Sequence, residues 1–209
     1  MQEDQAFALS SEEFKPTRRR VLGAFGVSSL ALIASSTPAS AFFFAKKEGA
    51  SSLDLSSFPS EWVHRQGRNL TDYANFIGSL KLRNVRTEQV IAAHAKRRGS
   101  VWNSLPPKSL WKNAAPTLKV IDRLSAELNQ PVKEIVSAYR SPAYNARCAG
   151  AKRGSWHQAN VAMDVKFPIR ASIVTSRVRS LRSRGMFKGG VGSYWNFTHI
   201  DTRGQSVDW

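Results

Sequence analysis

The sequence predicts an α+β domain in which helices pack on a small antiparallel sheet. Two observations predict this class. After residue 60 the chain first shows apolar residues at helical spacing, and only the last eighty residues contain short apolar runs bounded by Gly and Pro. Helices that precede a group of strands, rather than alternate with them, are typical of α+β domains.

The expected elements follow one another along the chain in a helical half and a strand-rich half. We expect helices over residues 70–80, 87–96 and 116–128, with a loop over 100–114. Strands are expected over 132–139, 162–167, 190–194 and 197–201, a long loop over 140–154, and a basic amphipathic helix over 168–184 whose inward side chains are Ile169, Ile173, Val174, Val178 and Leu181. Its arginines, from Arg177 to Arg184, are expected to form a solvated face or a surface that contacts the cell wall or lipid.

The N-terminal 41 residues have the three parts of a signal peptide. Arg18 to Arg20 precede a short apolar run, which ends in small residues before Ala41. The paired arginines resemble a twin-arginine export signal, so we predict a periplasmic protein. An uncleaved anchor or a buried helix is the alternative. Residues 42–60 are interpreted as a linker and residues 61–209 as one folded domain with a motif core at 132–209.

Composition and charge limit the partners of this domain. The 209 residues include 31 Lys and Arg against 15 Asp and Glu, a net charge of +16. Residues 42–209 keep 27 basic and 11 acidic side chains. An exported protein meets little nucleic acid, so we expect its partners to be anionic envelope surfaces. We also expect the protein to be a monomer. The single cysteine, Cys148, excludes an internal disulfide framework, and we interpret it as a small buried residue.

A possible metal site lies in the last third of the chain. His157, Asp164 and His199 supply two imidazoles and one carboxylate from a loop and two predicted strands. Three such ligands leave the fourth position of a tetrahedral zinc ion open, as in catalytic sites. Zinc lowers the pKa of a bound water to about 7 and polarises a carbonyl, which amide hydrolysis requires. Structural histidines are the alternative.

The order of the surrounding motifs resembles a known family. The chain reads Tyr139-Arg140-Ser141, Ser155-x-His157 with Asp164 seven residues later, Gly190-Val191-Gly192-x-Tyr194 and Phe197-x-His199-Ile200-Asp201. This series resembles the zinc D-alanyl-D-alanine carboxypeptidases and endopeptidases, whose fold groups with lysostaphin and hedgehog-type domains. It is most similar to the murein endopeptidase K branch.

The resemblance implies a zinc peptidase that hydrolyses amide bonds in peptidoglycan stem peptides or cross-links. It implies zinc ligands at His157, Asp164 and His199, and an Arg140 that faces the substrate. A surface arginine is the alternative for Arg140. Ser155 matches a motif serine, which we interpret as a structural hydrogen-bonding residue.

The general base and the substrate contacts are harder to assign. Relatives place a Glu or a His where this chain has Asn196 and Phe197, and Asn160 replaces a motif glycine. Asp201 shares a strand face with His199, so it either accepts a proton or orients His199. Substrate-binding residues are predicted at Tyr139, Ser141 and Tyr194; core packing is the alternative for these and the neighbouring aromatic residues Tyr144, Trp156 and Trp195.

Two rival functions remain at this point. The substitution at Asn196 is consistent with a catalytically inactive module that binds peptidoglycan. The high positive charge is consistent with an envelope-associated protein that has no metal.

Overall fold

The computed structural model describes residues 53–209. The signal peptide predicted over 1–41 and residues 42–52 of the predicted linker lie outside the described residues. Within the remainder of that linker, residues Leu55–Ser57 form a short 3-10 helix, η1, capped by the Asp54 carboxylate. The Phe58 ring packs on Trp62, with centroids 6.3 Å apart.

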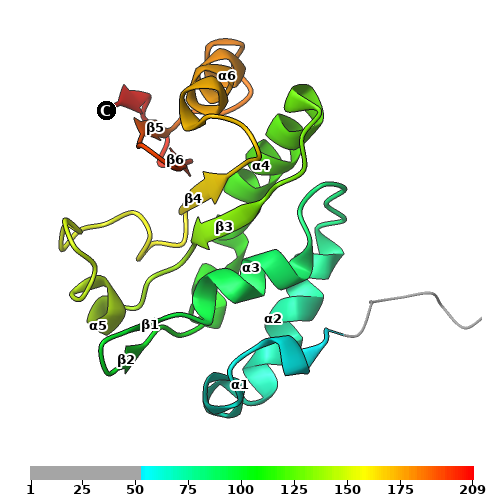
Figure 1. Ribbon diagram of the computed structural model, residues 1–209, viewed down its shortest axis with the longest axis vertical. Helices are drawn as coiled ribbons and strands as arrows, with labels where there is room; N and C mark the ends of the chain where they lie inside the picture. The colour runs from blue at the N-terminus through cyan, green and yellow to red at the C-terminus, as the bar shows by residue number, and fades with distance from the viewer. Residues whose placement is uncertain (1–52) are drawn as a thin grey trace, which may run out of the picture. The chain divides into compact units, whose positions relative to one another are not determined.

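The predicted α+β class is confirmed (Figure 1). The helices are α1 (Ser60–Gln66), α2 (Arg68–Ser79), α3 (Thr87–His94), α4 (Ala114–Leu128), α5 (Pro142–Asn145) and α6 (Ala171–Ser183), with a second 3-10 helix, η2 (Lys108–Asn113). The strands are β1 (Arg97–Arg98), β2 (Val101–Trp102), β3 (Glu134–Ser137), β4 (Ala162–Lys166), β5 (Gly190–Ser193), β6 (Thr198–Asp201) and β7 (Val207–Asp208). No helix of residues 53–209 has the length and apolar content needed to span a membrane.

The strands form a two-stranded hairpin, β1–β2, and a five-stranded sheet in the order β3-β4-β6-β5-β7. Neighbours in the larger sheet run antiparallel except β5 and β7, which are parallel. Strand β7 has only two residues, which are too few to give a periodic pattern in the sequence.

Side-chain alternation gives the five-stranded sheet two different faces. One face carries Met163 and Val165 of β4 and Ile200 of β6, which pack with α4 and α6 in the main core. The other face carries Asp164 of β4 and His199 of β6, which are directly paired across the strands. Figure 1 shows the long loop between β3 and β4 extending beyond the ends of these two strands. His157 of this loop contacts Asp164, so the loop covers part of the polar face.

Three local expectations differ from the structure. The segment 100–114, expected as a loop, contains β2 and η2. The segment 140–154 contains the short helix α5, which begins after Ser141. Ile173, expected to point inward, is half exposed, whereas Val174 is buried. One residue turns a helix by about 100°, so Val174 rather than Ile173 faces the sheet.

Arg177 and Arg184 of the expected solvated face are exposed, and three of the four arginines also form ion pairs. Arg179 and Arg182 both bind the Asp208 carboxylate, at 3.0 and 2.6 Å. Arg182 also donates to the carbonyl oxygens of Gly189 and Val207. Arg184 binds Glu127 at 2.7 Å. These side chains therefore attach β7 and α4 to α6.

Candidate metal centre

His157, Asp164 and His199 lie together, with one donor atom from each within 4.8 Å of the others. Asp164 is central. Its Oδ1 lies 2.8 Å from His199 Nδ1, and its Oδ2 lies 3.4 Å from His157 Nε2. All three side chains are buried. The structure therefore brings the three predicted metal ligands together from separate segments of the chain.

The backbone at the end of β3 orients His157. Its Nδ1 lies 2.7 Å from the carbonyl oxygen of Ala138, which can only accept, so Nδ1 carries the proton and Nε2 has a free lone pair. A second bond joins Arg140 N–H to the His157 carbonyl at 3.2 Å. Asn160, which replaces the motif glycine, has φ +58°, a left-handed conformation that asparagine tolerates. Ser155 Oγ accepts from the His157 amide at 3.4 Å, in keeping with a structural role.

Asp201 orients the other imidazole. Its Oδ2 lies 3.1 Å from His199 Nε2. A proton on Nε2 satisfies this contact. Nδ1 faces Asp164 Oδ1 and donates to it when protonated; without that proton, Nδ1 offers its lone pair to a metal ion. The two rings thus present opposite nitrogens, Nε2 of His157 and Nδ1 of His199, toward the same carboxylate.

Both oxygens of Asp201 are already engaged. Oδ1 accepts from the backbone amides of Gly190 and Arg203, at 2.9 and 3.1 Å, and from Arg203 Nε at 2.8 Å. Oδ2 accepts from Arg203 Nη2 as well as from His199. The residue is completely buried. The Asp201 carboxylate therefore holds the His199 imidazole and the Arg203 guanidinium in place.

Arg140 lies beside Asp164 rather than on the surface. Its Nη2 donates to Asp164 Oδ2 at 2.7 Å and its Nε to Ser137 Oγ at 2.8 Å. Ser137 is the cross-strand neighbour of Asp164 where β3 is bulged. These bonds leave Nη1 without a hydrogen bond in the described part of the chain. Arg140 is therefore placed to contact both a metal ligand and a molecule bound next to it.

The pKa values of the cluster follow from burial and opposite charge. Burial lowers the pKa of His157, and the Asp164 charge only partly offsets this. Burial alone would raise the pKa of Asp164, but the charge and hydrogen bond of His157, with those of His199, hold it well below its usual range. Burial also opposes the charged form of His199, but hydrogen bonds to Asp164 and Asp201 outweigh it and raise the pKa. A deprotonated carboxylate is the form that binds a metal ion.

The donor set fits a zinc ion. Zinc bonds of about 2.0–2.2 Å to nitrogen and oxygen in a tetrahedron place neighbouring donors about 3.3 Å apart. The two imidazoles contact different oxygens of Asp164, at 2.8 and 3.4 Å, and one donor atom of each residue lies within 4.8 Å of the others, which is close to this spacing. Each imidazole also has its second nitrogen bonded to an oxygen, the arrangement usual behind metal-binding histidines.

The predicted substrate-binding residues lie in different environments. The Tyr139 side chain is buried, and burial raises its pKa. Ser141 Oγ accepts from the Tyr144 amide at 3.3 Å and caps α5. Tyr194 is partly exposed and stacks on Phe197, with centroids 4.4 Å apart. Among the neighbouring aromatic residues, Tyr144 is buried, whereas Trp156 and Trp195 are exposed.

Arg203 is a further residue of the site, and it is not among those predicted from the sequence. Its guanidinium binds the Asp201 carboxylate and lies over the rings of Trp156 and Trp209, 5.0 and 5.1 Å from the centroids. The available signal was a basic residue two positions after a buried acid, which can fold back onto it.

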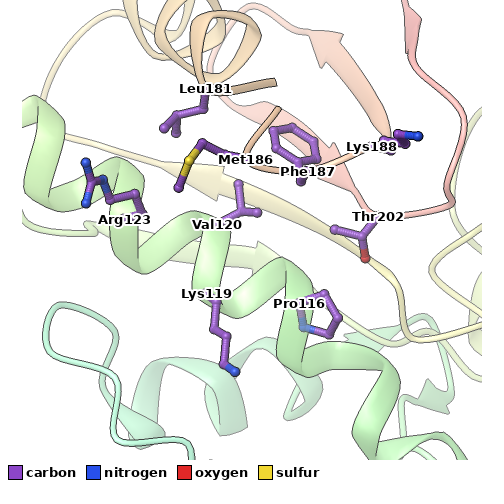
Figure 2. A pocket seen from close by; sticks show the side chains of 9 residues that line it. All are labelled: Pro116, Lys119, Val120, Arg123, Leu181, Met186, Phe187, Lys188 and Thr202. Atoms are coloured by element: carbon purple, nitrogen blue, oxygen red, sulfur yellow. The ribbon is translucent and has the colours of Figure 1, made fainter. Parts of the chain in front are cut away.

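A pocket of about 400 Å³ lies away from these residues (Figure 2). Figure 2 shows Met186 and Phe187 facing Val120 of α4, with Thr202 and three basic side chains nearby. The pocket is bordered by α4 and Leu181 of α6, which pack on the core face of the sheet. It contains none of the predicted site residues.

A comparison with protein families matches the region that contains the site. No curated protein and no solved structure shows a significant match to the chain. A family model described as Peptidase M15 matches residues 84–201, more than half of the chain. The matched region includes Arg140, His157, Asp164, His199 and Asp201. The chain belongs to the peptidase M15 family.

Proposed function

We propose that this chain is an exported zinc peptidase that hydrolyses amide bonds in peptidoglycan, with the cross-links between stem peptides as its preferred substrate. The observation that carries the proposal is the buried His157–Asp164–His199 cluster, in which hydrogen bonds leave one nitrogen of each imidazole directed at the shared carboxylate. Within the M15 family, the motif order supports membership of the murein endopeptidase K branch.

The ligands for zinc in this proposal are His157 Nε2, Asp164 and His199 Nδ1. When bound, zinc supplies Lewis acidity and makes a water molecule acidic enough to attack at neutral pH. Water adds to the carbonyl carbon of the substrate amide, and the carbon–nitrogen bond then breaks. The amine leaves with a proton that the water supplied, and the water oxygen stays on the new carboxyl group.

Arg140 has the electrostatic role. Negative charge develops on the carbonyl oxygen during attack, and a preorganised donor in a water-poor site stabilises it. The Nε and Nη2 bonds to Ser137 and Asp164 fix the guanidinium plane, and Nη1 remains to donate to the substrate oxygen. Stem peptides also carry carboxylates, which the same guanidinium can bind.

We assign Asp201 to orientation of His199 rather than to proton transfer. Its two oxygens accept from Gly190, Arg203 and His199, and these bonds hold its pKa well below its usual range although burial opposes this. A carboxylate of such low basicity takes a proton from water poorly. Substrate contacts are proposed at Tyr194, on the exposed side of the site, and at Tyr139 and Ser141, beside Arg140.

The proposed location is the periplasm, reached through the twin-arginine-type signal at residues 1–41. The excess of basic side chains is suited to the anionic cell envelope. We propose a monomer that acts on peptidoglycan and has no nucleic-acid partner.

Digestion of isolated sacculi tests this function. The purified full chain, loaded with zinc, is expected to convert cross-linked muropeptides to uncross-linked ones, as separated by chromatography and identified by mass spectrometry. Loss of terminal D-alanine with cross-links intact would instead indicate a carboxypeptidase. The Asp164→Ala variant is the control and is expected to release nothing.

A zinc-containing but inactive peptidoglycan-binding module is the second candidate. It is favoured by Asn196 and Phe197, which occupy the positions where relatives carry a base, and by the engaged state of Asp201. Stoichiometric zinc and binding to sacculi, with no peptide product, would support this candidate and contradict the first.

A further inference from the structure

The Trp209 side chain lies against the metal-site histidine. Its ring centroid is 5.0 Å from that of His199, and the planes are tilted by 49°. The indole Nε1 donates to Tyr194 Oη at 2.9 Å, and the Arg203 guanidinium lies over the same ring system. The indole therefore touches both ends of the interaction that joins His199, Asp201 and Arg203.

The indole of Trp209 packs directly against two glycines of β5. A Cβ atom on Gly192 would lie 2.6 Å from Trp209 Nε1, and one on Gly190 would lie 2.9 Å from its ring and 2.5 Å from Asp201 Oδ2. Real Cβ atoms do not approach other atoms so closely. Gly192 is thus explained by contact with Trp209, and Gly190 by contact with Asp201, Arg203 and Trp209, because both glycines lie on the strand face that carries the site.

The backbone around Trp209 is held at several points. Its amide donates to Val191 O at 3.3 Å, and its carbonyl accepts from the Ser193 amide at 2.8 Å. The preceding Asp208 binds Arg179 and Arg182 of α6. These contacts fix the position of an indole that is still 44% exposed.

We propose that Trp209 is a positioning residue for His199: its indole holds the imidazole in the orientation that directs Nδ1 at Asp164 and shields the His199–Asp201–Arg203 interactions from water. The inference rests on the proposed zinc site. Low local dielectric strengthens hydrogen bonds between charged groups, so a ring that excludes water there stiffens the imidazole. Groups that orient a metal-binding histidine typically change metal affinity by about 10–100-fold.

The test is the apparent zinc dissociation constant of the full chain, measured by competition with a chelating dye. Trp209→Ala is expected to raise it by about tenfold or more, and Trp209→Phe, which keeps an aromatic ring, by much less. Trp195→Ala is the matched control, because Trp195 is 98% exposed and is not among the metal-site residues. Circular dichroism establishes that each variant is folded.

A double-mutant cycle separates positioning from general stability. Gly192→Ala alone is expected to weaken zinc binding, because its Cβ displaces the indole. In the Trp209→Ala background the same change is expected to have little effect. If Trp209→Ala does not fold, the other two variants still test the inference. Gly192→Ala is expected to bind zinc more weakly, and Trp209→Phe is expected to retain most of its zinc affinity.

The inference would be overturned if folded Trp209→Ala, or Gly192→Ala, bound zinc with wild-type affinity. It would also be overturned if Gly192→Ala weakened zinc binding equally in the wild-type and Trp209→Ala backgrounds. Absence of zinc binding by the wild-type chain would instead contradict the proposed function itself.

Discussion

Asp201 and His199, two residues apart on β6, are joined by a 3.1 Å contact between Oδ2 and Nε2. The contact fixes which imidazole nitrogen faces Asp164, and Arg203 in turn holds the carboxylate. The sequence placed both side chains on one strand face, and the structure shows that Asp201 lies behind the histidine.

Asp201→Asn is therefore expected to weaken zinc binding by about 10–100-fold, because the amide no longer offers two anionic oxygens to His199 and Arg203. Zinc titration calorimetry measures this. Asp72→Asn, which removes an exposed carboxylate bound to Lys108 at 2.9 Å, serves as the control. Unchanged affinity in Asp201→Asn would remove the orienting role.

Arg140→Ala is expected to lower kcat by about 10²–10³-fold while the protein retains its zinc. The reason is that Arg140 touches Asp164 through Nη2 but still has Nη1 available for the substrate. Turnover of a cross-linked muropeptide and zinc content are measured together. Arg147→Ala, an exposed arginine in the same loop, should change neither. Loss of zinc in Arg140→Ala would show that its role is structural.

His94 makes stability depend on pH. It is completely buried against the Tyr73 ring, and burial lowers its pKa from 6.5 to about 4. The unfolded chain therefore takes up this proton before the folded chain does, so stability is lost as the pH falls from about 6.5 to about 4. At pH 4.5 the loss from this group is about 2 to 3 kcal/mol.

Urea denaturation at pH 7 and pH 4.5 measures that loss. His94→Gln should lose less stability than the wild type over the same interval, whatever its stability at pH 7. An equal loss in both proteins would show that His94 is not the group responsible.

Gly189→Ala is expected to destabilise the fold by more than about 3 kcal/mol. A Cβ there would collide with the backbone carbonyl group of Asp201, which cannot move without distorting β6. Gly78→Ala is the contrasting variant, because a Cβ in α2 meets nothing within 4 Å. It should stabilise the protein by about 0.5–1 kcal/mol. Similar midpoints for both variants in chemical denaturation would contradict this.

The sequence predicted those parts of the fold that have long periodic patterns. Helix α4 and strands β4 and β6 are close to their expected positions, because their apolar residues recur at a regular spacing. Strand β7 and the hairpin β1–β2 have two residues in each strand and no pattern of their own. Strand β7 forms because longer elements offer it partners, namely β5 and the Arg179 and Arg182 side chains of α6, whereas β1 and β2 pair with each other.

The candidate site divides in the same way. The three predicted ligands meet because Asp164 and His199 are cross-strand partners and Ala138 holds His157. The contacts of Arg203 and Trp209 were not predictable from local sequence. They depend on how the chain after β6 folds back over the site, and on the absence of side chains at Gly190 and Gly192.

Zinc binding by the full chain and by its His199→Ala variant tests the central claim most directly. Elemental analysis after equilibration with zinc and removal of the excess is expected to give one zinc per wild-type chain. The variant, which keeps only two of the three donors, is expected to retain almost none. Equal zinc content in the two proteins would contradict the account, because the metal would then be held elsewhere.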